Sequence, residues 1–212
     1  MSELEKEKFF CDLEKVKSDE ELLRFTRKYV IHGIPYVFKN NEHKFYDFRE
    51  RIAKKWEVPF HEVFISGSAK LGFSYIKGTE FNENSDIDVA IISKTLFERV
   101  MEGIEHFQWK IRNRQITLHE EALDKYHSFL KYLAIGWIRP DLLPIQLQLL
   151  GDNPLRREWF DFFQSISYGK SEIGNYKVSA GVYKSYPHFE KYIYNGIQVK
   201  YRSVIASIAK GV

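Results

Sequence analysis

The sequence has almost no cysteine and no long apolar run. Cys11 is the single cysteine among 212 residues, so an internal disulfide and a zinc site built from cysteines are excluded. No stretch of about 18 uncharged apolar residues occurs, which excludes a membrane-spanning helix. The first residues are charged and of mixed sign, unlike a signal peptide. We therefore expect a cytoplasmic protein with no membrane partner.

The chain does contain enough apolar material for one folded domain. Apolar residues make up 44% of the sequence, and its length suits a single domain with helical extensions. The formal net charge is only +3, but it is uneven, because residues 175–212 hold six basic side chains and one acidic one. That segment, which is rich in tyrosine, either faces a polyanion such as RNA or is an ordinary solvated helix with its tyrosines in the core.

Hydrophobic periodicity and end signals predict the order of elements. Ser18 to Glu21 has the pattern of a capping box at the start of a helix. Further helices are expected over 42–56, 94–110, 118–135, 145–166 (broken at 151–154) and 189–210, a helical turn over 69–73, and strands over 63–65, 86–92 and 176–183. Residues 75–85 and 136–144 are expected to be connections.

This order predicts the α/β (α+β) class, a small mixed sheet flanked by helices. We expect one domain over 1–212, with N-terminal helices in 1–60, the core in 61–185 and a C-terminal helix in 186–212.

The strand over 86–92 carries two carboxylates on one face. Side chains alternate along a strand, so Asp86 and Asp88 point one way while Ile87, Val89 and Ile91 point toward a core. Neighbouring carboxylates repel each other unless a cation neutralises them, and Mg²⁺ is bound through one or two carboxylates together with substrate phosphates. The alternative is an exposed acidic strand with no ligand.

A Gly-Ser pair precedes this strand and strengthens the case for a phosphate site. Gly67 and Ser68 directly follow the strand over 63–65 and precede a helical turn. Glycine lets backbone approach a phosphate, and the N–H groups at a helix start attract anions. Asp86 follows Ser68 by eighteen residues, so one segment would hold phosphates and the other the metal ion that bridges them.

The segments Ile65–Gly72 and Ser85–Val89 resemble the signature of the DNA polymerase β-like nucleotidyltransferase superfamily, nearest its small bacterial members. The resemblance covers roughly residues 62–92. It implies that Gly67 and Ser68 hold the β- and γ-phosphates of a nucleoside triphosphate, and that Asp86 and Asp88 bind Mg²⁺ or Mn²⁺ and carry the catalysis. The implied reaction transfers a nucleoside monophosphate to a hydroxyl of an RNA end, a protein or a small molecule. Small members of this superfamily often belong to bacterial toxin–antitoxin or phage-defence systems.

Active members of that superfamily usually carry a third carboxylate on a later strand. The strand expected over 176–183 has none, and Asp141, Asp152 and Asp161 lie in a connection or in helices. Two hypotheses therefore stand: a metal-dependent nucleotidyltransferase, or a catalytically impaired module that binds a nucleotide or a partner as a regulator.

Other readings of these residues are weaker. Gly67 to Gly72 has the spacing of a P-loop start, but Phe73-Ser74 stands where Lys-Ser/Thr is required. Asp86-x-Asp88 also fits a nucleotide-sugar glycosyltransferase, a family that lacks the upstream strand and Gly-Ser pair. The seven histidines have no metal-ligand spacing. Lys70 is either a further triphosphate contact or an ordinary surface lysine.

Overall fold

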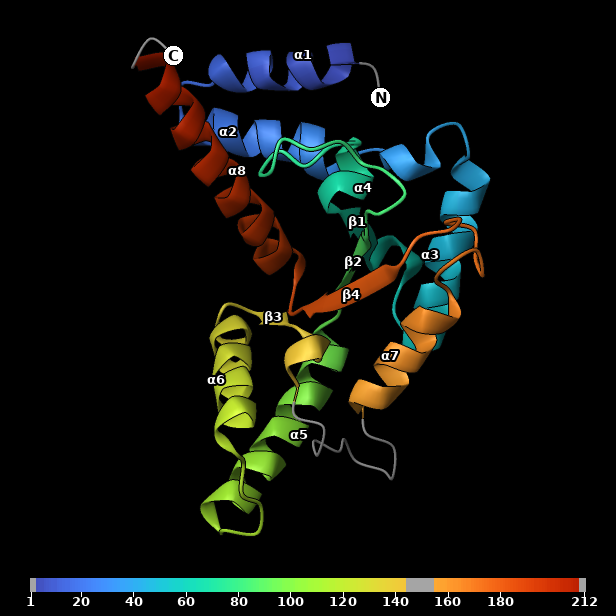
Figure 1. Ribbon diagram of the computed structural model, residues 1–212, viewed down its shortest axis with the longest axis vertical. Coiled ribbons are helices and arrows are strands. Elements are labelled where there is room, and N and C mark those ends of the chain that lie inside the picture. Colours follow the sequence, from blue (N-terminus) through green and yellow to red (C-terminus); the bar gives the residue numbers. More distant parts are fainter. Residues whose placement is uncertain (1–2, 144–154, 210–212) are drawn as a thin grey trace.

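The computed structural model, which describes residues 3–143 and 155–209, contains a four-stranded mixed sheet with helices on both faces (Figure 1). Its strands are β1 (Val63–Ser66), β2 (Ile87–Ile92), β3 (Trp137–Ile138) and β4 (Val178–Tyr183). They lie in the order β1-β2-β4-β3; β2 and β4 run parallel, and the two outer pairs are antiparallel. The predicted α+β class is confirmed.

The helices follow the predicted order closely. They are α1 (Glu3–Glu14), α2 (Asp19–Phe25), the π-helix η1 (Thr26–Ile31), α3 (Glu42–Trp56), α4 (Gly67–Leu71), α5 (Lys94–Arg112), α6 (Glu120–Ala134), α7 (Leu155–Ser165) and α8 (Tyr186–Ala209), with short 3₁₀ turns η2 (Tyr36–Phe38), η3 (Phe60–Glu62) and η4 (Pro140–Leu142). Helix α3 spans the predicted residues, and α8 is one continuous helix. The predicted segment 145–154 lies outside the described residues.

The predicted capping of α2 is confirmed with one change. The Ser18 hydroxyl accepts a hydrogen bond from the backbone N–H of Glu21 at 3.2 Å. The Glu21 carboxylate accepts from the backbone N–H of Lys17 at 2.7 Å rather than from Ser18. Two backbone N–H groups near the start of α2 therefore have side-chain acceptors, as in a capping box.

The prediction of a plain connection over 136–144 was wrong. Trp137 and Ile138 form β3, which pairs with Tyr183 and Val182 of β4, and η4 follows. A two-residue strand is too short to show an alternating pattern, so only its pairing with β4 defines it.

Each face of the sheet is covered by a different set of helices. Ile87, Val89 and Ile91 belong to one buried cluster, with side chains from α3, α5 and α7. Ala90 and Ile92 belong to a second cluster, with side chains from α1, α2 and α8. In Figure 1, α3 and α7 accordingly lie on one side of the sheet and α8, with α1 and α2, on the other. The N-terminal helices are thus divided between the two faces.

Tyrosines of α8 hold this helix against the N-terminal segment. The Tyr201 hydroxyl donates to the backbone carbonyl of Val16 at 2.7 Å, and the Tyr194 hydroxyl donates to Asp19 at 3.1 Å. These contacts favour an ordinary packed helix over a tyrosine-lined surface for RNA.

No helix within residues 3–143 and 155–209 combines the length and the apolar character needed to cross a membrane.

The packing of α3 on the sheet should contribute measurably to stability. Ile52 is fully buried in the cluster of α3, α5 and α7, whereas Lys54 is exposed on the same helix. We expect Ile52→Ala to lower the free energy of unfolding by about 2–5 kcal/mol because it leaves a cavity. Lys54→Ala should change it by less than about 0.5 kcal/mol. Denaturant unfolding measures both, and similar values for the two variants would contradict the described packing.

Candidate functional site

The turn after β1 lies directly against Asp88. Ser66 pairs with Asp88 across the antiparallel β1–β2 ladder, and Gly67 follows with φ +67°. A Cβ atom at position 67 would lie 2.8 Å from Asp88 Oδ2, which is closer than such atoms approach. Position 67 therefore requires glycine for its backbone conformation and for the space that Asp88 occupies.

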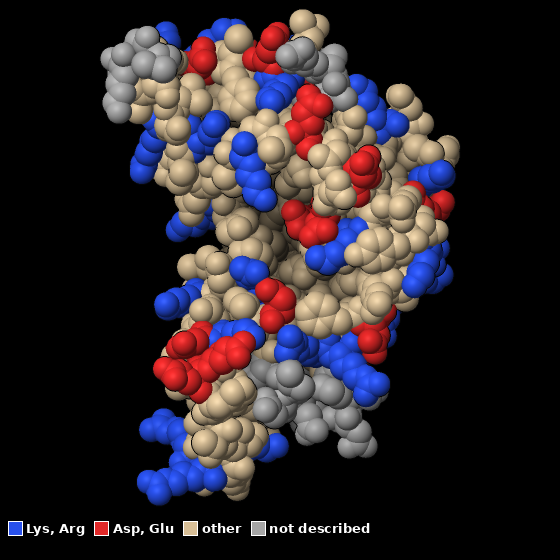
Figure 2. Space-filling model, in the orientation of Figure 1, with Lys and Arg blue, Asp and Glu red and all other residues tan. Residues whose placement is uncertain are grey.

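Asp88 lies near the start of β2, where water can reach it. Its residue is exposed, yet the surrounding protein raises the pKa of its carboxyl through desolvation, the largest effect, which a hydrogen bond from Ser179 opposes. Ser179 Oγ donates to Asp88 Oδ1 at 3.2 Å, while Oδ2 faces Gly67. Figure 2 shows the surface hollowed near the middle of the molecule, where acidic and basic side chains meet. A carboxylate that water can reach but does not fully solvate favours a cation.

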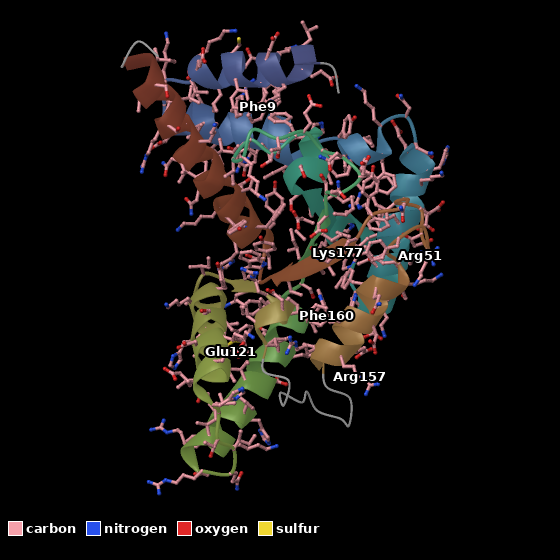
Figure 3. The ribbon with its side chains drawn as sticks, in the orientation of Figure 1. Phe9, Arg51, Glu121, Arg157, Phe160 and Lys177 are labelled. Carbon is pink, nitrogen blue, oxygen red and sulfur yellow. The ribbon has the colours of Figure 1, made fainter. Side chains whose placement is uncertain are left out.

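Asp86 forms an ion pair with Lys177 at the edge of the same region. The two charged groups lie 3.1 Å apart, and each side chain is about half exposed, 47% for Asp86 and 55% for Lys177. The hydrogen bond to Asp86 raises the pKa of Lys177. Figure 3 shows Lys177 beside β4 near the middle of the molecule. A pair this exposed is weak and can be exchanged for another ligand.

Within the part of the chain that the structure describes, no third carboxylate joins Asp86 and Asp88 at this site. In the parallel β2–β4 ladder the residue paired with Asp88 is Ser179. Asp141, within η4, pairs with Arg139, and Asp161 pairs with Arg157 on α7, while Asp152 lies outside the described residues. Over residues 3–143 and 155–209, no three Asp, Glu, His or Cys side chains are grouped so that they could hold a metal ion.

Ser68 and Lys70 lie on α4 but differ in their surroundings. Ser68 is half-buried in the first turn, which has no side-chain cap, and Ser66 Oγ donates to the backbone carbonyl of Asp88 at 3.3 Å. The first N–H groups of a helix have no acceptor within it, so those of α4 are available to an anion. Lys70 instead is buried, and its ammonium donates to the carbonyls of His32 and Gly33. The interpretation of Lys70 as an ordinary surface lysine was wrong, and its hydrogen bonds lead away from Asp86 and Asp88.

Sequence reasoning did not single out Lys177 and Ser179. Alternation along the strand predicted over 176–183 places both on one face, which was a usable signal. What the sequence alone lacked was the register with β2, because it depends on a parallel pairing of segments about 90 residues apart.

The residues present fit one divalent cation better than two. Asp86 and Asp88 offer hard carboxylate oxygens on one face of the sheet, a set that Mg²⁺ accepts when phosphate oxygens complete its shell. Binding at Asp86 would displace Lys177 from its ion pair. A second cation would need a further carboxylate, and the residue beside Asp88 on β4 is Ser179.

The chain matches no family model, no curated protein and no solved structure. The resemblance to nucleotidyltransferases therefore rests on the sequence motif within residues 62–92.

The contact between Gly67 and Asp88 can be tested against a matched glycine. Gly78 has a similar positive φ of +74°, but no atom lies within 4 Å of the position its Cβ would take. We expect Gly78→Ala to cost about 1–2 kcal/mol of unfolding free energy through left-handed strain alone. Gly67→Ala should cost clearly more, because it also displaces the Asp88 carboxylate. Equal losses in denaturant unfolding would show that this contact is unimportant.

The raised pKa of Asp88 predicts a pH-dependent effect of neutralising it. A carboxyl whose pKa is higher in the folded state stabilises the fold below its unfolded pKa, and this contribution is lost as pH rises through the folded pKa. In EDTA at pH 7, Asp88→Asn should therefore be more thermostable than the unsubstituted protein, and the difference should shrink below about pH 4.

The control for this measurement is Asp86→Asn, which removes only an exposed ion pair and should change the melting temperature little. A destabilised Asp88→Asn at pH 7 would contradict the assigned desolvation.

Proposed function

We propose that the chain is a metal-dependent nucleotidyltransferase that binds a nucleoside triphosphate with Mg²⁺ at Gly67, Ser68, Asp86 and Asp88. It transfers a nucleoside monophosphate to a hydroxyl acceptor and releases pyrophosphate. The observation that carries the proposal is the β1–β2 register, which brings the Gly67 backbone against Asp88 with Asp86 two residues away.

Different residues of the site would bind the phosphates and the cation. The uncapped first turn of α4, at Gly67 and Ser68, offers N–H groups and a hydroxyl to the β- and γ-phosphates. Asp86 and Asp88 would hold the cation through their carboxylate oxygens. The bound cation would supply neutralisation of the charge that develops on the phosphates during in-line attack on the α-phosphorus. Lys177 adds a further positive charge at the edge of this site.

The proposed acceptor is an RNA end, a protein or a small molecule. The proposal also includes a role in a toxin–antitoxin or phage-defence system, which only the resemblance supports. Since Tyr194 and Tyr201 of α8 are engaged with the N-terminal segment, the basic C-terminal residues give no strong support to RNA in particular.

A second candidate is a module that binds the nucleotide without transferring it. Ser179 favours this candidate, because it stands where β4 would present a third carboxylate beside Asp88. Without that group, the site lacks a second-cation ligand and a general base for the acceptor hydroxyl.

A transfer assay tests the first candidate. Purified protein is incubated with each α-labelled nucleoside triphosphate, Mg²⁺ or Mn²⁺, total RNA and cell lysate, beside the Asp86→Ala/Asp88→Ala variant. We expect label on a macromolecular or small product, and none with the variant. Metal-dependent nucleotide binding without transfer would favour the binding module. The absence of both nucleotide binding and transfer would overturn both candidates.

Restoring a carboxylate at position 179 separates the two candidates further. We expect Ser179→Asp to raise the transfer rate by about tenfold or more, because a well-placed general base contributes about 100-fold or more. Ser179→Asn has nearly the same shape without the charge and should give no gain. Equal rates for the two variants would mean that the third carboxylate is not what limits this site.

A further inference from the structure

A pocket of about 670 Å³ lies along the free edge of β1, on the side away from β2. The wall on this edge is formed by Val63, Phe64 and Ile65. The other walls come from α2 and η1, the connection after η1, α3, α4 and the start of α8. Its volume suits a small ligand, since pockets for such ligands measure about 300–1,000 Å³.

The pocket is strongly positive. Five of the lining residues are Arg24, Arg27, Lys28, Arg49 and Lys70, and none of the lining residues is an aspartate or glutamate. Glu190 neutralises one of these cations: both of its oxygens accept from Arg27, at 2.6 and 2.9 Å. The other four have no ion pair with a carboxylate among residues 3–143 and 155–209.

Lys70 is the most unusual of these cations because it is only 5% exposed. Its ammonium donates to the carbonyls of His32 and Gly33, both at 2.6 Å, which uses two of its three protons. Burial lowers the pKa of Lys70 to about 8, so the group remains mostly charged at neutral pH. Buried charges are normally paired with an opposite charge, and none of the described carboxylates serves here.

Arg49 is held in place before any ligand arrives. Its Nε donates to the carbonyl of Phe60 at 2.9 Å, and its guanidinium lies 5.1 Å from the ring centres of both Phe45 and Phe60. Stacking and the hydrogen bond fix the plane of the guanidinium and leave its terminal N–H groups for a planar or tetrahedral oxyanion.

We infer that this pocket binds a nucleotide-sized organic phosphate with two or more negative charges, without a metal ion. The four unpaired cations call for a multiply charged anion, and phosphate is well matched to arginine and lysine donors. Lys70 is reached only by a group that enters the pocket, which favours a small molecule over a nucleic-acid backbone. The partly exposed rings of Phe45, Phe64 and Tyr186 supply contact for its organic part.

The pocket and the carboxylate site are separated by β1. Ile65 lines the pocket, whereas the next residue, Ser66, pairs with Asp88 across the opposite edge of the strand. Helix α4 touches both places, with Gly67 against Asp88 and Lys70 in the pocket. Asp86 and Asp88 take no part in binding this ligand, so the inference does not depend on the proposed nucleotidyl transfer.

Calorimetric titration in EDTA tests the inference with three probes: ATP, pyrophosphate and inorganic phosphate. Removal of metal ions keeps the carboxylate site from contributing. We expect ATP or pyrophosphate to bind with a dissociation constant below 1 mM, more weakly as salt is added, and inorganic phosphate to bind least. ATP binding more tightly than pyrophosphate would mean that the rings contact the organic part.

Matched variants locate the binding. Arg24→Ala/Lys28→Ala removes two exposed cations of the pocket, and we expect the affinity to fall about tenfold or more. Lys70→Met should also weaken binding. If that variant fails to fold, the Arg24→Ala/Lys28→Ala variant tests the inference instead. Arg99→Ala/Lys131→Ala removes the same charge from α5 and α6, outside the pocket, and should bind normally. Asp86→Ala/Asp88→Ala should do so too.

Three results would overturn the inference. One is the absence of binding by both ATP and pyrophosphate up to millimolar concentration. Another is an equal loss of affinity in the Arg99→Ala/Lys131→Ala variant, which would mean non-specific attraction to positive charge. The third is loss of binding in Asp86→Ala/Asp88→Ala, which would place the anion at the carboxylates instead.

Discussion

The register of three adjacent strands is the constraint on which the site depends. Ser66 of β1, Asp88 of β2 and Ser179 of β4 lie in one row across the sheet, joined by an antiparallel and a parallel ladder. A shift by one residue in either ladder would turn the neighbouring side chain to the other face. The buried clusters on both faces prevent such a shift, because Ile87, Val89 and Ile91 must remain on the side of α3. Core packing thus determines which side chains surround Asp88.

Helices cover both faces of the sheet, and the carboxylates lie outside this cover. One face is filled by α3, α5 and α7 and the other by α1, α2 and α8. Asp86, directly before β2, and Asp88 lie beyond this cover at one end of the strands, where the turn after β1 also arrives. Charged side chains are tolerated there because water reaches them, and the same access would admit a ligand.

Local features were predictable because short-range patterns determine them. The Ser18 cap, helix α3 and the alternation of Asp86 and Asp88 with buried isoleucines all follow from neighbours in the sequence. Long-range pairing was not predictable, which is why the two-residue strand β3 and the position of Ser179 beside Asp88 were missed. Lys70 was misread for a related reason: its burial depends on the 32–33 backbone, which approaches it only in the folded chain.

The distribution of charge across β1 is the least expected property of the fold. Asp86 and Asp88 lie beyond one edge of this strand, and the uncompensated cations of the pocket lie along the other. The two groups do not neutralise each other: Asp86 pairs with Lys177, Asp88 accepts from Ser179, and Lys70 donates only to carbonyls. Among the described residues, neither Asp88 nor Lys70 forms an ion pair, and burial disfavours the charged form of each, which lowers stability. Such an arrangement is understandable when each side has a partner of its own, a cation with phosphates on one side and a phosphate anion on the other.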